Sequence, residues 1–169
     1  MDFPYTNHIN QPEDIMAVRN IIKDGDETLL KKSRAVEQFD ERLWTLLDDM
    51  LETMRAAEGV GLAAVQVGVL RRVCIVDIGD GLIELINPEI IAADGVQEDV
   101  EGCLSYPNQW AITRRPRAVK VKAQNRRGKK FIIKGEDLKA RALCHEIDHL
   151  DGIVFKAHVI RELDESELT

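Results

Sequence analysis

The sequence lacks any long apolar run, and this absence excludes several classes of protein. No apolar stretch approaches the roughly eighteen residues of a membrane-spanning helix. Residues 1–20 carry no apolar core of the kind found in secretory signal peptides. The chain has neither low-complexity tracts nor a repeat of solenoid period. We therefore expect no membrane partner and no repeat architecture.

Cysteine is also scarce, and the 23 basic residues are outnumbered by 30 acidic ones. The chain has 3 cysteines, an odd number, so a disulfide framework is not expected and the reducing cytoplasm is the expected compartment. The formal net charge of −7 argues against DNA or another nucleic acid as the main partner. With 44% hydrophobic and 31% charged residues, the 169 residues are expected to form one globular domain.

The most informative stretch is His145-Glu146-Ile147-Asp148-His149. Two histidines four positions apart on a helix share one face, so both imidazoles can bind one metal ion. A glutamate directly after the first histidine is the usual general base for a metal-activated water. The chain has only 4 histidines, and this stretch contains two of them, which makes a chance match less expected. The alternative is a surface helix with two ordinary histidines.

Such a metal site needs a third protein ligand, and two familiar protease patterns do not supply it. One pattern continues His-x-x-Gly-x-x-His; Gly152 fits its glycine, but Phe155 stands in place of its third histidine. The other uses a glutamate on a second helix about twenty residues downstream. Glu165 and Glu167 lie near that distance, but the remaining sequence has no room for a supporting helix.

Cysteine supplies a candidate third ligand. Cys103 lies in the polar, glycine-containing segment Glu101–Ser105, and its thiolate suits a borderline-soft divalent metal. Cys74 lies in an apolar run and is predicted to be a buried core thiol. Cys144 lies about 100° around the helix from His145 and is predicted to face the core.

Hydrophobic spacing predicts two helices on either side of a strand-rich middle. Apolar residues recur at helical spacing from Asp40 to Glu58, and Gly59 is predicted to cap that helix. The helix carrying the two histidines is predicted from Asp137 to Leu150, with Gly152 as its stop. Its core-facing residues are predicted to be Leu143, Ile147 and Leu150. Strands are predicted at residues 71–78, 82–86, 118–123 and 131–133. This order predicts an α+β fold with antiparallel sheets packed around a central metal-binding helix.

Three segments together resemble a known family. They are Gly59–Gln66 (Gly-Val-Gly-Leu-Ala-Ala-Val-Gln), Glu101–Ser105 (Glu-Gly-Cys-Leu-Ser) and His145–Leu150 (His-Glu-Ile-Asp-His-Leu). They are similar to the three signature motifs of peptide deformylase, in the family's order and at similar spacing. The resemblance covers approximately residues 16–158. It implies a metal-dependent hydrolase that removes the N-formyl group from the N-terminal formylmethionine of newly synthesised peptides and releases formate.

The resemblance also implies a role for each motif residue. The metal ligands would be Cys103, His145 and His149, and Glu146 would be the general base. The side-chain amide of Gln66 and the backbone N–H of Leu104 would stabilise the oxyanion. Backbone groups of Val60, Gly61 and Gly102 would bind the substrate as an added strand, and Val60 is a candidate wall of the methionine pocket. Without the family match, Gln66 has an alternative role in joining a helix to a loop by hydrogen bonds.

The metal, the partners and the domain limits follow from the same resemblance. A Cys-His-His ligand set suits zinc, but also Fe(II), Co(II) and Ni(II). The family implies Fe(II) as the native metal, with Zn, Ni or Co able to substitute. We expect a cytoplasmic monomer that acts on N-formylmethionyl nascent peptides. Residues 16–169 are predicted to be one catalytic domain, and the polar residues 1–15, with two prolines, a disordered leader or N-terminal extension.

Two departures from the family pattern matter. Many bacterial members carry a long C-terminal helix after the metal helix, whereas only residues 156–169 follow here. Ribosome docking by such a helix is therefore in doubt. Trp110 stands where many relatives have a basic residue. Its ring either floors part of the peptide cleft or covers the edge of the core.

Basic residues cluster at positions 114–134, which contain ten lysines or arginines and no acidic residue. One interpretation is a solvated hairpin whose charge protects a sheet edge from pairing. The other is salt-sensitive docking to ribosomal RNA. We favour edge protection and keep the ribosome as a candidate partner.

Two other functions would produce different sequence features. A generic zinc peptidase would cleave internal peptide bonds and would need neither Cys103 nor a formyl group. A non-catalytic binding protein of the same fold would be expected to lose Glu146 or Gln66, and this chain keeps both.

Overall fold

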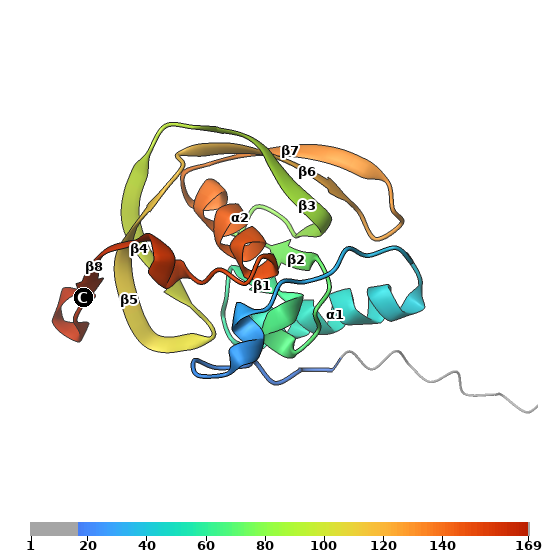
Figure 1. The fold of residues 1–169 in the computed structure, drawn as a ribbon, viewed down its shortest axis with the longest axis horizontal. Coiled ribbons are helices and arrows are strands. Elements are labelled where there is room, and N and C mark those ends of the chain that lie inside the picture. Colours follow the sequence, from blue (N-terminus) through green and yellow to red (C-terminus); the bar gives the residue numbers. More distant parts are fainter. Residues whose placement is uncertain (1–16, 169) are drawn as a thin grey trace, which may run out of the picture.

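The chain forms a first long helix, then a strand-rich middle, then a second long helix (Figure 1). The computed structural model describes residues 17–168, so the leader predicted at residues 1–15 lies outside the described residues. The long helices are α1 (Glu41–Ala56) and α2 (Asp137–Leu150). The strands are β1 (Gly61–Ala63), β2 (Val73–Val76), β3 (Ile83–Asp94), β4 (Gln97–Cys103), β5 (Tyr106–Arg115), β6 (Ala118–Gln124), β7 (Lys130–Glu136) and β8 (Val159–Leu163). The short 3-10 helices are η1 (Glu27–Leu30), η2 (Ala64–Val67), η3 (Phe155–His158) and η4 (Glu165–Glu167). Among residues 17–168, no helix combines enough length with enough apolar character to span a membrane.

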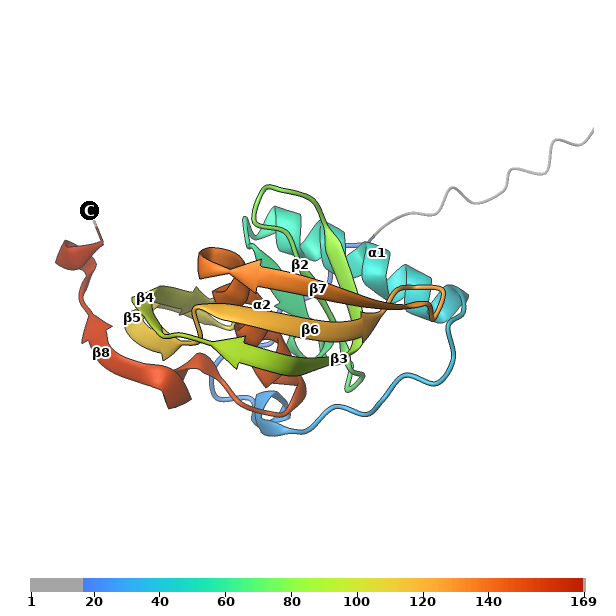
Figure 2. The ribbon, with the colours of Figure 1, turned by 90° about the horizontal axis from the view of Figure 1, so that it is seen from above.

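Two antiparallel sheets are arranged around α2. The larger sheet has the strand order β1-β2-β3-β6-β7, and the smaller has the order β4-β5-β8. In Figure 1 the strands β3, β6 and β7 pass above α2, and β1 and β2 lie below it. Figure 2, seen from above, shows the same three strands covering the helix. The predicted α+β fold with antiparallel sheets around a central helix is confirmed.

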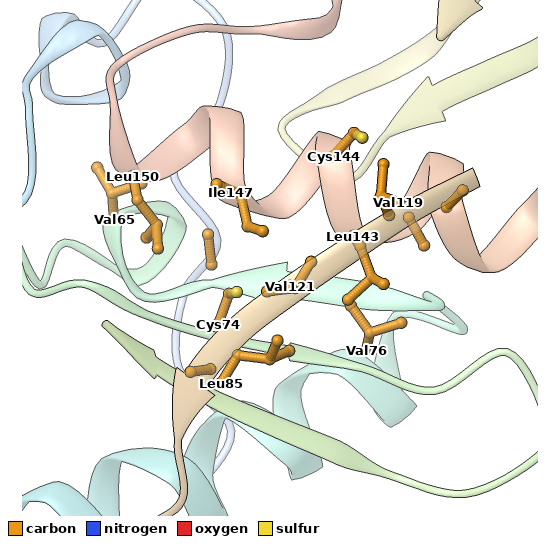
Figure 3. Packing of buried hydrophobic residues seen from close by; sticks show 14 residues of the cluster. Val65, Cys74, Val76, Leu85, Val119, Val121, Leu143, Cys144, Ile147 and Leu150 are labelled. Carbon is orange, nitrogen blue, oxygen red and sulfur yellow. The ribbon is translucent and has the colours of Figure 1, made fainter. Parts of the chain in front are cut away.

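The apolar face of α2 packs against the larger sheet. Leu143, Ile147 and Leu150 are buried in one cluster with residues of that sheet, as predicted (Figure 3). Cys74 and Cys144 lie in the same cluster and are also buried, as predicted. Burying one such aliphatic side chain stabilises a fold by about 1.5–3 kcal/mol. This face therefore fixes α2, and with it the two histidines, on the sheet.

The helix α1 ends earlier than predicted. The prediction that Gly59 caps it is wrong, because Ala57 is the cap residue and Glu58 adopts the left-handed backbone, with φ of 55°. Glycine is the residue that usually takes this conformation, so the sequence signal pointed one residue too far. Gly59 instead allows the side chain of Leu104 to pack closely against the backbone, since a Cβ at this position would lie 2.7 Å from the Cδ1 of Leu104.

The β4–β5 hairpin was not predicted from the sequence, whereas the four predicted strands correspond to β2, β3, β6 and β7. Residues 98–100 of β4 are all exposed, so the strand shows no alternation of apolar and polar residues. It is held by pairing with β5, in which Glu98 lies opposite Arg114 and Glu101 opposite Ala111. A register shift between Glu101 and Cys103 ends the strand. The hairpin thereby delivers Cys103 from a part of the chain far from α2.

Gly152, the predicted stop of α2, generates a prediction about stability. It has φ of 72° and follows the cap residue Asp151. A Cβ at this position would collide with the backbone carbonyl of Leu30. We expect Gly152→Ala to lower the free energy of unfolding by about 2–4 kcal/mol, because left-handed strain and overpacking of rigid backbone add together. Chemical denaturation measures the loss.

Gly68→Ala is the matched control for this change. Gly68 has a similar φ of 83°, but a Cβ there would meet only the Cδ1 of Ile22, at 3.7 Å. The control should therefore lose only the strain, about 1 kcal/mol. Equal losses in the two variants would contradict the proposed collision with Leu30.

Candidate metal centre and cleft

Three side chains from separate parts of the chain converge between β4 and α2. The Sγ of Cys103 and one ring nitrogen each of His145 and His149 all lie within 4.8 Å of one another. Cys103 is the last residue of β4, and the histidines lie about one turn apart on α2, so both rings reach the same side of the helix. Within residues 17–168 no other group of three histidine, cysteine or carboxylate side chains converges in this way.

The two imidazole rings are oriented by different neighbours. Nδ1 of His145 lies 3.3 Å from Oε1 of Glu101. The other ring nitrogen of His145, Nε2, is therefore the one that can bind a metal. Nε2 of His149 lies 3.4 Å from the Sγ of Cys103. The buried Nδ1 of His149 has no hydrogen-bond partner in the described part of the chain. One thiolate with two imidazoles is a donor set that fits zinc, Fe(II) and neighbouring divalent metals.

Neither protease pattern supplies a ligand here. The ring of Phe155, at the position of the third histidine in one pattern, packs on the ring of His145 with centroids 6.2 Å apart and an interplanar angle of 26°. Glu165 and Glu167 lie in the exposed helix η4 and do not belong to the converging group. Both patterns are therefore incomplete, as the sequence predicted.

Glu146 lies beside His145 in the wall of a cleft and is buried. Burial raises the pKa of its carboxyl group to about 7, although the positive charges of His145 and Arg115 oppose that shift. Its Oε2 has no hydrogen-bond partner among residues 17–168. A carboxylate with a free oxygen and a pKa near neutrality is suited to accept and return a proton.

Two motif glycines allow the backbone to approach functional side chains closely. A Cβ on Gly61 would lie 2.5 Å from Oε1 of Glu146. A Cβ on Gly102 would lie 2.5 Å from Cζ3 of Trp110, whose ring also lines the cleft. Any larger residue at either glycine would displace the side chain behind it. Of the two interpretations of Trp110, the structure agrees with the one that places its ring in the cleft.

Gln66 is held beside Cys103 by hydrogen bonds at both ends of its amide. It is buried in η2, where its Oε1 accepts from the N–H of Ala63 at 2.9 Å. Its Nε2 donates to the Oγ of Ser105 at 3.1 Å and lies 3.7 Å from the Sγ of Cys103. The amide nitrogen therefore faces the point where the three donors converge. Leu104 follows Cys103 in the turn between β4 and β5.

A buried ion-pair network that was not predicted from the sequence lies behind His145. Arg115 donates from Nε and Nη2 to the two oxygens of Glu101, at 3.2 and 3.3 Å, and from Nη1 to Asp148 at 2.5 Å. Burial alone would raise the pKa of Glu101, but hydrogen bonds and charges from His145 and Arg115 outweigh it and lower the pKa to about 2. Arg115 is only 3% exposed, although it belongs to the basic cluster at residues 114–134. One sequence signal could have indicated this network. Glu101 lies two residues before Cys103, and alternate residues of a strand share a face, so Glu101 could have been expected on the same side as Cys103.

A cleft of about 540 Å³ opens beside these groups. The volume lies within the range of sites that bind small molecules or peptide ends. Its wall includes four large apolar side chains that are 41–51% exposed, namely Val60, Val100, Trp110 and Leu138. Such a concentration of exposed apolar surface indicates a binding site. The predicted site residues that line the cleft are Val60, Gly61, Gln66, Gly102, Cys103, Leu104, His145 and Glu146, and His149 lies fully buried behind them.

Comparisons with known proteins agree on one family over most of the chain. Residues 18–165 match the family described as polypeptide deformylase. A peptide deformylase of Acetivibrio thermocellus is 60% identical over 153 residues, which cover 90% of this chain and 90% of that protein. The crystal structure of a peptide deformylase from Legionella pneumophila is 46% identical, with a TM-score of 0.82 over 85% of this chain and 86% of that chain. A peptide deformylase from Ehrlichia chaffeensis, solved in complex with actinonin, is 36% identical, with a TM-score of 0.83 over 90% and 92%.

The convergence of three donors generates a prediction about metal content. We expect Cys103→Ser, His145→Ala and His149→Ala each to lose most of the bound metal, because a site with three protein ligands cannot spare one. Elemental analysis of the purified variants measures the ratio of metal to protein. Cys144→Ala is the control, since this buried thiol neighbours His145 but lies in the core cluster. A full complement of metal in Cys103→Ser would remove Cys103 from the ligand set.

Proposed function

The chain belongs to the polypeptide deformylase family, and we propose that the residues converging on its cleft carry out that family's reaction. The enzyme is a metal-dependent hydrolase that removes the N-formyl group from N-formylmethionyl peptides and releases formate. One observation carries the assignment of residues. Glu146 holds a buried carboxylate oxygen that has no partner within residues 17–168, beside three converging metal donors.

Cys103, His145 and His149 would hold one divalent metal ion. We propose Fe(II) as the native metal, with Zn, Ni or Co able to substitute, because one thiolate and two imidazoles suit all of them. When bound, the metal supplies Lewis-acid activation of a water molecule and of the formyl carbonyl group. Cys103 is partly exposed, which makes it the ligand most open to oxidation.

Glu146 would move the proton in the reaction. Its carboxylate takes a proton from the attacking water and later delivers it to the departing amine nitrogen as the C–N bond of the formamide breaks. Burial raises the pKa of this carboxyl group above its ordinary value, which is the direction that helps it return the proton to the departing amine. The close approach of Gly61 limits where the carboxylate can lie.

Gln66 and Leu104 would donate hydrogen bonds to the oxyanion that forms during hydrolysis. The bond from Ala63 N–H to Oε1 of Gln66 keeps the Nε2 of that side chain turned toward Cys103. The backbone N–H of Leu104 directly follows Cys103 in the chain. Donors that are fixed before the reaction require no reorganisation when negative charge develops.

The substrate peptide would bind as an added strand between two sheet edges. β1 is an edge strand of the larger sheet and β4 an edge strand of the smaller one. Gly61 of β1 and Gly102 of β4 both line the cleft, together with Val60. Main-chain groups of these residues would pair with the peptide, which makes binding tolerant of side chains beyond the first. The methionine side chain would lie against the apolar wall that contains Val60 and Leu138.

The cellular context is part of the same proposal. We propose a monomer in the cytoplasm, with residues 16–169 as one catalytic domain and residues 1–15 as a leader or N-terminal extension. Cys74, Cys103 and Cys144 form no disulfide within the described residues, and a reducing compartment would keep Cys103 available to bind the metal.

Glu146 generates a prediction about catalysis. We expect Glu146→Gln to keep its metal but to lose about 10²–10⁴-fold in kcat, with KM little changed, because the side chain is isosteric and only proton transfer is lost. Formate release from a formyl-methionyl peptide measures turnover. Glu98→Gln, an exposed carboxylate on β4, is the control and should turn over normally. Near-normal kcat in Glu146→Gln would exclude Glu146 as the base, and cleavage of internal peptide bonds by wild type would favour a general peptidase.

The β6–β7 hairpin is the candidate surface for a ribosome partner, and its free positive charge is smaller than the sequence suggested. Within the basic cluster at residues 114–134, Arg115 at the end of β5 is buried, and Arg126 at the hairpin turn is paired with Glu84 at 2.7 Å and with Asp48 at 2.8 Å. The exposed basic residues at the hairpin turn that form no ion pair within the described residues are Arg127, Lys129 and Lys130. β7 is also an edge strand of the larger sheet, so edge protection remains the alternative role.

The hairpin generates a prediction about ribosome binding. If it contacts ribosomal RNA, wild type should co-sediment with ribosomes at low salt and dissociate steeply as salt rises. Changing Arg127, Lys129 and Lys130 together to Glu should abolish that binding without affecting formyl-peptide hydrolysis. Changing the exposed residues Lys31, Lys32 and Arg34 to Glu gives a control with the same change in net charge. Absence of wild-type binding at low salt would leave edge protection as the only role.

A further inference from the structure

The short helix η3 contacts α2 on the side that carries His145. A 3-10 helix has about three residues per turn, so Phe155 and His158 share one face of η3. The ring of Phe155 packs on that of His145, with centroids 6.2 Å apart. Nε2 of His158 lies 2.9 Å from Oδ2 of Asp148. One short element therefore touches the metal-binding helix at two points.

The second contact continues inward through polar contacts. The same Oδ2 of Asp148 accepts a hydrogen bond from Nη1 of Arg115 at 2.5 Å. Nε of Arg115 donates to Oε1 of Glu101 at 3.2 Å, and that oxygen lies 3.3 Å from Nδ1 of His145. An unbroken series of contacts thus runs from His158, whose side chain is 35% exposed, to His145.

The inner members of this series cannot replace a lost partner with bulk water. The side chains of Arg115 and Glu101 are almost fully buried, and that of Asp148 is 20% exposed. Buried charges depend on the geometry of their partners far more than exposed ones do. Asp148 uses one oxygen for both Arg115 and His158, so His158 limits the rotation of the carboxylate. An exposed surface ion pair, by contrast, contributes little, because solvent and salt screen it.

We propose that His158 is a positioning residue for the metal centre, acting through Asp148, Arg115 and Glu101 to fix the ring of His145. The inference rests on the proposed role of His145 as a metal ligand. Hydrogen-bond partners of ligating histidines set ring orientation and basicity, and their loss weakens metal binding about 10–100-fold. His158 does not contact His145 directly but acts through three residues between them, so its effect should be smaller than that of a direct partner. We therefore expect its loss to weaken binding about three- to tenfold.

Co(II) is the probe that tests this, because its visible absorption bands report the geometry of its ligands. Metal-free protein is titrated with Co(II) against a competing chelator, for wild type, His158→Ala and His158→Gln. The Gln amide can donate to Asp148 from nearly the position of the imidazole Nε2. We expect His158→Ala to bind Co(II) about three- to tenfold more weakly, with shifted bands, and His158→Gln to restore both. In the alanine variant kcat should fall while KM stays close to wild type.

The control for the neighbouring surface is Arg161→Gln. It breaks an exposed ion pair with Glu167 on the following segment and should leave Co(II) affinity and bands unchanged. If His158→Ala fails to fold, His158→Asn replaces it, since its shorter amide cannot reach Asp148. Weaker binding by His158→Asn than by His158→Gln would then support the inference.

Two results would be adverse, and they point to different assignments. Wild-type Co(II) affinity and bands in His158→Ala, or in His158→Asn where that variant replaces it, would overturn the positioning role. Retention of Co(II) by His145→Ala would overturn the ligand assignment on which that role rests.

Discussion

The buried guanidinium of Arg115 joins the two halves of the site. Cys103 ends a strand of the smaller sheet, whereas the two histidines lie on α2, which packs against the larger sheet. Arg115 bonds Glu101 on the cysteine's strand and Asp148 on the histidines' helix. Removing one partner of a buried ion pair costs about 3–5 kcal/mol, because it leaves a charge without compensation. The hairpin and the helix are thereby held together, and the three candidate metal donors on β4 and α2 keep one geometry.

Two sheet edges with no further strand of the described chain paired to them form part of the wall of the cleft. β1 and β4 are edge strands, and each contributes a glycine to the cleft. The space that a Cβ would need at Gly61 is taken by the carboxylate of Glu146, and at Gly102 by the ring of Trp110. Main-chain groups and reactive side chains can therefore lie next to one another without side chains between them. A peptide that pairs with these edges would bring its N-terminal formyl group toward Glu146.

The bounds of α2 could be predicted from the sequence to the residue, but the β4–β5 hairpin that completes the candidate site could not. The bounds of α2 follow from its buried apolar face and the glycine stop, which are local properties. β4 owes its place to pairing with β5, and its exposed middle residues carry no periodic signal. Cys103 was therefore predicted from its polar, glycine-containing segment and its motif, and not from a predicted strand. The burial of Arg115 and the contact of His158 with Asp148 depend on tertiary neighbours. Residue type alone would place both residues on the surface.

Two glutamates near His145 show how environment rather than residue type separates structural from chemical roles. Burial raises the pKa of Glu146 to about 7, whereas the hydrogen bonds and charges of His145 and Arg115 overcome burial and lower that of Glu101 to about 2. At neutral pH Glu101 is charged and accepts the Nδ1–H of His145, while Glu146 can exchange a proton. A divalent cation beside Glu146 would favour its charged form and lower its pKa. Because the folded pKa of Glu101 lies below its ordinary value of 4.5, its contribution to stability is present above pH 4.5 and is lost as the pH falls toward 2. Glu101 thus stays charged across the pH range in which Glu146 titrates, so a change in the protonation of Glu146 leaves the contact between Glu101 and His145 in place.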